Sequence, residues 1–268
     1  MMESENAKRV DEHSETLSQR RFGQFAQNYV TSVPHAQGED LVRLLALAQP
    51  HADWEMLDVA TGGGHTALKF APLVASVTVS DITPAMLGAA EKHLRTKGVR
   101  NAIFKQTAAE DLPFGNASFD LVTCRIAPHH FDDAPRFVQQ AVRVLKPGGI
   151  LLVQDHLLPE DVLTARYIEA FEKLRDPGHN QAFTEGEWRT MFRDAGLTVA
   201  HSEPLHKDLN FGTWTERQGV TRNTKACLNA LMEQAPPAAQ TWMHPQHWGT
   251  PTATYRCHHI IIKGVKRG

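Results

Sequence analysis

Cysteines are scarce in this 268-residue sequence, which contains Cys124, Cys227 and Cys257. Their number is odd and no two of them form a Cys-x-x-Cys pair, so the sequence favours neither a disulfide framework nor a cysteine-based zinc site. Long hydrophobic runs are missing too. The apolar stretches 149–153 and 260–262 are far shorter than the roughly 20 residues of a membrane-spanning helix, and we expect no membrane span.

The sequence also lacks a strong excess of charge of either sign. Its 28 lysines and arginines and 30 aspartates and glutamates give a formal net charge of −2. Proteins that bind nucleic acids usually carry basic patches or stripes, so this balance fits a small-molecule partner better. The N-terminus is charged from its third residue and has no apolar segment typical of a signal peptide. We therefore expect a cytoplasmic protein.

Apolar periodicity divides the chain into regions. Residues 1–20 are polar without a clear period and predict a flexible tail. Residues 21–160 predict an α/β domain, because two helices precede short apolar strands that alternate with helices. The looser segment 161–253 predicts a helical cap, and 254–268 contains a last strand.

A glycine-rich loop follows the first predicted strand, where residues 57–65 read LDVATGGGH. Such a loop lets backbone N–H groups approach a ligand closely. Asp81 ends the next strand, where a carboxylate can accept both ribose hydroxyls of an adenosine. Asp58 would repel a pyrophosphate but suits a ligand that carries an ammonium and a sulfonium group. The pattern therefore predicts an adenosine ligand and disfavours a dinucleotide.

Four segments in this order resemble the class I methyltransferases that depend on S-adenosylmethionine (SAM), and in particular the type 11 branch with the ubiquinone and menaquinone C-methyltransferases. The segments are MLDVATGGGH at 56–65, VSDIT at 79–83, AEDLPF at 109–114 and VLKPGG at 144–149. The resemblance implies a doubly wound, Rossmann-like sheet of seven mostly parallel strands. Its last strand, at about 255–263, would run antiparallel.

The resemblance also implies which residues hold the cofactor SAM. The glycine loop would meet the methionine end, Asp81 the ribose, Ile82 the adenine face, and Ala109 with Glu110 the adenine edge. Many relatives carry an acid at the position of Ala108, and that acid would bind the adenine amino group. This sequence has an alanine there instead. The full set of expected cofactor residues is Asp58, Thr61, Gly62, Gly64, Asp81, Ile82, Ala109, Glu110 and Arg125.

The fourth predicted strand leads into the residues that we expect near the acceptor. Arg125 could bind the cofactor carboxylate or an anionic substrate, or pair with a neighbouring acid. His129 and His130 are candidate catalytic residues, since imidazole titrates near neutral pH. We favour His130, although structural histidines remain an alternative. Further candidates for substrate contact are Tyr29, His35, Asp155 and His156.

The fifteen histidines raise the question of a metal site. His244 and His247, together with the segment 257–259, come nearest to ligand spacing. Adjacent residues on a strand face opposite ways, however, so this segment does not offer all its side chains to one ion. We expect no metal site.

The sequence thus predicts a SAM-dependent methyltransferase that acts on a small molecule by in-line methyl transfer. Alternatives are a non-catalytic SAM-binding module and, less favoured, a nucleotide-dependent oxidoreductase. The accepting atom, the use of a general base and the oligomeric state stay open, because the SAM methyl group is already activated and methyl transfer requires few fixed side chains.

Overall fold

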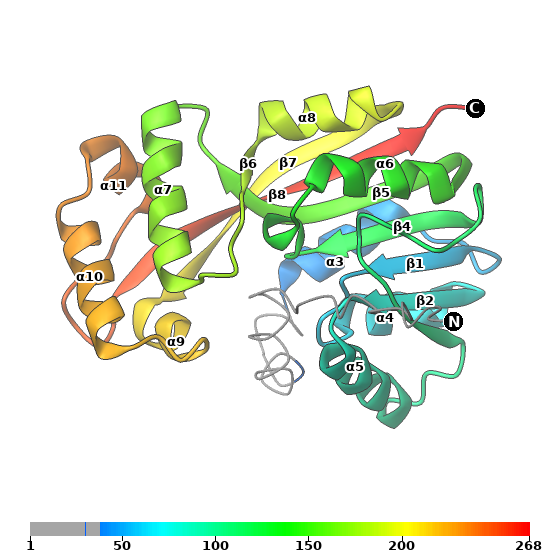
Figure 1. Ribbon diagram of the computed structural model, residues 1–268, viewed down its shortest axis with the longest axis horizontal. Coiled ribbons are helices and arrows are strands. Elements are labelled where there is room, and N and C mark those ends of the chain that lie inside the picture. Colours follow the sequence, from blue (N-terminus) through cyan, green and yellow to red (C-terminus); the bar gives the residue numbers. More distant parts are fainter. Residues whose placement is uncertain (1–29, 31–37) are drawn as a thin grey trace, which may run out of the picture.

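The computed structural model describes residue 30 and residues 38–268, which form an α/β structure around one mixed sheet (Figure 1). The strands lie in the order β3-β2-β1-β4-β5-β8-β7, and β6 pairs with β5 off this path. The strands are β1 (Glu55–Val59), β2 (Ser76–Asp81), β3 (Ala102–Gln106), β4 (Phe119–Arg125), β5 (Leu145–Leu158), β6 (Phe183–Thr184), β7 (Leu197–Asn210) and β8 (Thr254–Lys266).

Strand directions confirm the predicted fold. Strands β1 to β5 pair in parallel, whereas β8 runs antiparallel to both β5 and β7. The last strand of the chain is therefore the antiparallel one, as the resemblance implied. No helix of the described part of the chain is long and apolar enough to cross a membrane.

Helices cover both faces of the sheet because each presents one apolar side to it. On α6, for example, Phe137, Val138, Ala141 and Val144 are all buried, at the spacing of one helical face. One hydrophobic core lies between the sheet and helices α6 and α8, and a second lies under α3, α4 and α5. These helices are α3 (Glu39–Ala48), α4 (His65–Phe70), α5 (Pro84–Thr96), α6 (Ala134–Val144) and α8 (Glu185–Asp194), and the 3₁₀ turn η1 (Ala71–Leu73) follows α4.

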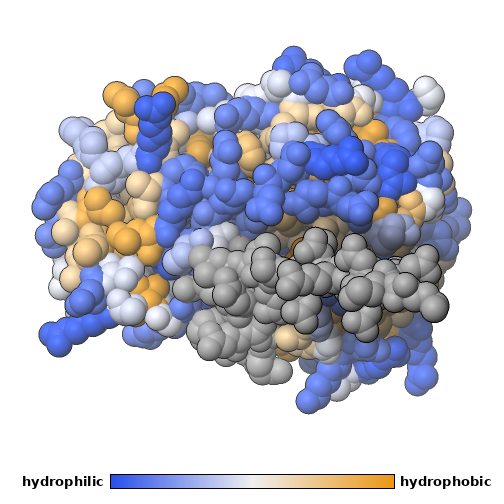
Figure 2. Space-filling view, viewed as in Figure 1, coloured by the Kyte–Doolittle hydropathy of each residue, from blue (hydrophilic) through white to orange (hydrophobic). Residues whose placement is uncertain are grey.

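A second lobe is built around the far ends of β7 and β8, at the left of Figure 1. Its own hydrophobic core includes Phe171, Trp214, Leu228 and Tyr255. Hydrophobic side chains show on its surface in Figure 2, while hydrophilic ones cover much of the rest of that face. The helices of this lobe are α7 (Val162–Arg175), α9 (Phe211–Glu216), α10 (Arg222–Glu233) and α11 (Pro237–Met243).

Strand β7 was not predicted from the sequence. It is an edge strand of alternating burial that contains Pro204 and several charged residues, and such strands lack a strong apolar pattern. The segment 161–253, expected to be a cap, therefore includes β7 and α8, which pack with the main sheet, as well as the helices of the second lobe.

Candidate functional site

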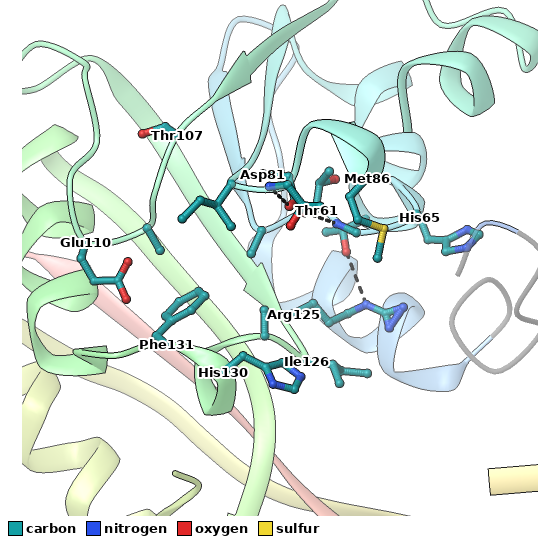
Figure 3. A pocket seen from close by; sticks show the side chains of 18 of the residues that line it. Thr61, His65, Asp81, Met86, Thr107, Glu110, Arg125, Ile126, His130 and Phe131 are labelled. Atoms are coloured by element: carbon teal, nitrogen blue, oxygen red, sulfur yellow. Dashed lines mark hydrogen bonds between the residues drawn. The ribbon is translucent and has the colours of Figure 1, made fainter. Parts of the chain in front are cut away.

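A cavity opens at the carboxyl ends of β1, β2 and β4, where ligands of open α/β sheets usually bind (Figure 3). It brings together seven of the nine residues expected to hold the cofactor. Those seven are Thr61, Gly62, Asp81, Ile82, Ala109, Glu110 and Arg125. We call this space the first cavity. Asp58 and Gly64 do not line it.

Asp58 lies beneath the glycine loop and stabilises it from below. Its side chain is buried and accepts hydrogen bonds from the hydroxyls of Thr61 and Thr123, both at 2.7 Å. Burial raises the pKa of Asp58, and these hydrogen bonds oppose the shift. The carboxylate therefore ties the loop after β1 to strand β4 without itself reaching the first cavity.

Asp81 connects the loop to the end of β2. Its carboxylate accepts the backbone N–H of Gly62 at 3.1 Å and the backbone N–H of Thr83 at 2.9 Å. Burial raises its pKa to about 6, against the effect of these two hydrogen bonds. A carboxylate fixed in this way, on the wall of a cavity, has oxygens oriented to accept further hydrogen bonds (Figure 3).

The two glycines expected at the cofactor have different physical reasons to be glycine. Both have positive φ, +55° at Gly62 and +79° at Gly64. A Cβ on Gly64 would lie 2.5 Å from Leu94 Cδ1 on α5, whereas a Cβ on Gly62 would meet no atom within 4 Å. Gly64 therefore allows close packing of the loop on α5, and Gly62 keeps the first cavity open.

The far side of the first cavity contains residues that the sequence did not reveal. Phe131 and Asp132 follow the turn η2 (Pro128–His130) and line the cavity. The backbone N–H of Asp132 donates to Glu110 Oε1 at 3.1 Å, which joins the two walls. Sequence reasoning missed these residues because only the fold brings the segment after η2 to the wall of this cavity. Other lining residues missed are His65, Thr66, Thr83, Met86 and Thr107.

Arg125 forms the salt bridge considered as its alternative role, and it lines the first cavity as well. Its Nη1 lies 3.0 Å from Asp40 Oδ2, with both side chains almost fully buried. Lys207 Nζ lies 2.9 Å from the other oxygen of Asp40. Asp40, at the start of α3, therefore balances two cations, and its pKa is lowered by Arg125 and Lys207 although burial alone would raise it.

A second cavity lies next to the first and extends toward the other lobe. Ile126 and His130 line both cavities, so the two spaces meet at the segment that follows β4. Ile126 has a φ of +53°, which is rare and strained for a β-branched residue and marks a backbone held by its surroundings. The second cavity is also lined by His129, His156, Arg175, Asp176, Lys207, Leu209, Trp214, Arg217, Gln218, Cys257 and His259.

His130 is held in one tautomer by the backbone. Its Nδ1 lies 2.8 Å from the carbonyl oxygen of Gly178, and a carbonyl only accepts, so Nδ1 carries the proton. In the neutral ring Nε2 is then the basic nitrogen. Burial lowers the pKa of His130 to about 4, which keeps the ring neutral at physiological pH but makes it a weak base.

His129 is fixed by Asp155, which lies behind it. Asp155 accepts the backbone N–H of His129 at 2.7 Å and faces the ring Nδ1 at 2.6 Å. Burial and the surrounding histidines lower the pKa of His129, so its imidazole is neutral and donates Nδ1–H to the carboxylate. Asp155 lines neither cavity and thus orients His129, whereas His156 reaches the second cavity. Tyr29 and His35 lie outside the described residues.

Comparison with known proteins places this geometry among methyltransferases. The family described as "Methyltransferase domain" matches residues 57–153. The chain is 33% identical to the uncharacterized methyltransferase YcgJ of Bacillus subtilis, over 92% of this chain and 98% of that protein. It is 37% identical to the ubiquinone/menaquinone biosynthesis C-methyltransferase UbiE of Shewanella sediminis, over 42% of this chain and 47% of UbiE.

Solved structures agree with these sequence matches. A crystal structure from Bacillus halodurans C-125 superposes with a TM-score of 0.83 at 34% identity, and it covers 86% of this chain and 100% of that one. The similarity thus extends through the second lobe as well as the glycine loop. The UbiE match, in contrast, covers less than half of either chain.

Proposed function

Because this chain belongs to the family of SAM-dependent methyltransferases, we propose that it transfers the methyl group of SAM to a small molecule. The observation that carries this proposal is the meeting of the two cavities at Ile126 and His130. One cavity has the loop and carboxylate expected for an adenosine ligand. The other has room for an acceptor beside it.

The first cavity fits SAM on the chemistry of its lining. Gly62 leaves open space where any side chain would project, and the Asp81 carboxylate offers acceptor oxygens for the two ribose hydroxyls. We propose that Ile82 and Phe131 flank the adenine, and that Glu110 or Asp132 compensates for the acid missing at Ala108. Asp58 and Gly64 would contribute by holding the loop, and Arg125 would lie near the methionine carboxylate.

We propose that the second cavity binds the acceptor. When bound, SAM supplies a methyl group activated by its sulfonium, so the protein has to align the acceptor and exclude water. Trp214 and Leu209 give this cavity an apolar wall, whereas Arg175, Lys207 and Arg217 give it cationic groups. A small acceptor with both an apolar part and an anionic or acidic group suits this lining.

His130 lies where a proton acceptor is needed, at the junction of the cavities. We propose that its Nε2 accepts a hydrogen bond or a proton from the acceptor atom, while Gly178 holds the ring through Nδ1. His129, fixed by Asp155, would shape the adjoining wall, and His156 would contact the acceptor. This assignment uses His130 as the catalytic residue and Asp155 as a positioning residue.

The wider expectations stay proposals as well. We propose that residues 161–253 select the acceptor, through the helices of the second lobe that close one side of the second cavity. Residues 21–160 would bind SAM, and residues 254–268 would complete the sheet. A small-molecule rather than nucleic acid partner agrees with the net charge of −2, and we propose a cytoplasmic location as well.

Calorimetry combined with an acceptor screen tests this function. We expect SAM and S-adenosylhomocysteine to bind and NAD not to bind. With SAM present, a panel of small acidic acceptors is screened by mass spectrometry for S-adenosylhomocysteine and methylated product. Binding of NAD without SAM would overturn the proposal, and methylation of RNA or DNA but of no small molecule would contradict the acceptor class.

A further inference from the structure

Three potential metal ligands come together on one wall of the second cavity: His156, Cys257 and His259. One ligand atom from each lies within 4.8 Å of the others. The strand pairing explains this, because His156 on β5 lies directly opposite His259 on β8. Cys257 precedes His259 by two residues, so all three side chains project from the same face of the sheet.

One ring nitrogen in this cluster has no hydrogen-bond partner in the described part of the chain. Nδ1 of His259 is buried and has no hydrogen-bond partner among the described residues. The other nitrogen, Nε2, lies 3.9 Å from Cys257 Sγ, which is at most a weak hydrogen bond. A buried imidazole nitrogen without a partner is unusual in a folded protein and is a reason to look for a missing ligand.

The charges around the cluster permit a cation. Lys207, Arg175 and Arg217 line the same cavity, and Lys207 and Arg175 each have a nearby acid. Lys207 Nζ lies 2.9 Å from Asp40, and Arg175 Nη1 lies 3.8 Å from Asp176. A divalent ion bound by a thiolate adds a single net positive charge. Asp40 and Asp176 therefore offset part of the positive charge that the basic residues of this cavity place around the ion.

We propose that His156, Cys257 and His259 bind a zinc ion. Imidazole nitrogens and a thiolate sulfur are the donors that zinc prefers, at about 2.0–2.3 Å, and small side-chain rotations would bring the three donors to that distance. Three protein ligands with an open fourth position are typical of zinc sites that bind an exchangeable ligand. The sequence pattern argued against such a site because it shows only the two ligands from β8 and hides the one that β5 supplies.

The open position would face the second cavity. An acceptor thiol or hydroxyl could bind there as its anion, with its proton released to solvent. This use of the ion rests on the proposed methyltransferase function. The ion itself does not, because its binding can be measured without SAM or acceptor.

Metal binding by the full-length chain without an affinity tag tests the site. A Cys227→Ser background removes the exposed cysteine, which could bind metal by itself. Zinc content is measured by mass spectrometry, zinc affinity by competition with a chromophoric chelator, and thiolate ligation by the charge-transfer band of the cobalt-substituted protein. We expect stoichiometric zinc and a thiolate-to-cobalt band. Cys257→Ser should abolish the band, and His259→Ala should lower zinc affinity by about a hundredfold or more, since even outer partners of zinc ligands are worth about 10–100-fold.

His258→Asn is the matched control. His258 lies between two of the proposed ligands, but its ring stacks on Trp242 and its Nε2 is 2.9 Å from the Trp242 carbonyl oxygen. This variant should keep zinc and the cobalt band. The proposal is overturned if the parent protein shows no thiolate-to-cobalt band, and this test does not depend on the folding of any variant. It is also overturned if His258→Asn and His259→Ala bind zinc equally well. SAM affinity, measured in parallel, reports separately on the proposed function.

Discussion

The two cavities of this protein differ in how their residues are distributed along the chain. The first is built from short turns that directly follow β1, β2, β3 and β4, so neighbouring residues in the sequence are also neighbours in the site. The second collects side chains from η2, β5, α7, β7, α9 and β8, which span residues 126–259. One site is therefore local and the other depends on the whole fold.

The two cavities also differ in whether backbone conformation or side-chain identity determines their lining. The first cavity depends on backbone conformation, as the positive φ of Gly62 and the N–H groups held by Asp81 indicate. The second cavity depends on side-chain identity, with four histidines and three basic residues. Under the proposed function, the first kind of site would bind the common cofactor and the second would select the acceptor.

The largest expected effect separates two roles within the glycine loop. Gly64→Ala should lower the free energy of unfolding by about 2–5 kcal/mol, because it adds a clash with buried Leu94 to the cost of positive φ. Gly62→Ala carries only the cost of positive φ, about 1–2 kcal/mol, but projects into the first cavity. Denaturant unfolding and SAM calorimetry measure both. Equal destabilisation by the two alanines would contradict the packing role of Gly64.

A second prediction tests whether His130, at the junction of the cavities, acts as a catalytic base. With an acceptor from the screen, His130→Ala should lower kcat by about a hundredfold, at the lower end for a lost general base because a base of low pKa is weak. SAM affinity should change little. His129→Ala serves as the comparison, since Asp155 fixes that ring as part of the wall.

The pH dependence of this effect follows from the lowered pKa of His130. Because that pKa is about 4, the ring stays neutral between pH 6 and 9, and kcat should not show a histidine titration in that range. Near wild-type kcat in His130→Ala would exclude base catalysis by this residue. Alignment of the acceptor would then account for the rate.

The third prediction concerns Asp81, the carboxylate proposed to bind the ribose. Asp81→Ala removes the acceptor for two hydroxyls and for the N–H of Gly62, and should weaken SAM binding about 10- to 100-fold. Asp120→Asn is a suitable control. Asp120 is a partly buried carboxylate that, like Asp81, accepts a backbone N–H, but it lies at the start of β4, the end away from the first cavity. Calorimetry should find SAM affinity unchanged in that variant.

The sequence predicted the local features of this protein well. The strands after Glu55, the loop with Gly62 and the position of Asp81 follow from short-range patterns, and the resemblance implied the antiparallel last strand. What it missed depends on contacts between distant segments. Phe131 lines the first cavity because of the way the turn η2 folds. Strand β7 lacks a strong apolar pattern because it is an edge strand.

Long-range pairing also explains why the cluster in the second cavity was not predicted. His156 and His259 are far apart in the chain, and the register of β5 with β8 makes them neighbours. A one-residue shift of that register would turn every side chain to the other face. Composition and spacing do not reveal the register of two distant strands. The glycine loop, in contrast, can be predicted from its own local sequence.

The smallest expected effect is a pH dependence of cofactor binding that arises from Asp81 alone. Burial raises the pKa of this carboxyl to about 6, so lowering the pH through 6 protonates it and removes its capacity to accept both ribose hydroxyls. SAM affinity should level off near pH 7 and fall up to tenfold per pH unit below about 6. Between pH 5 and 7 the cofactor keeps its charges, because an α-carboxyl group titrates near 3.5 and an α-amino group near 8.

Calorimetry of the parent protein and of Asp81→Asn over this range isolates the contribution of the carboxylate from that of the histidines. A slope that persists in Asp81→Asn would assign the pH dependence to another group, and a flat profile in the parent would show that Asp81 does not need its charge to bind the ribose.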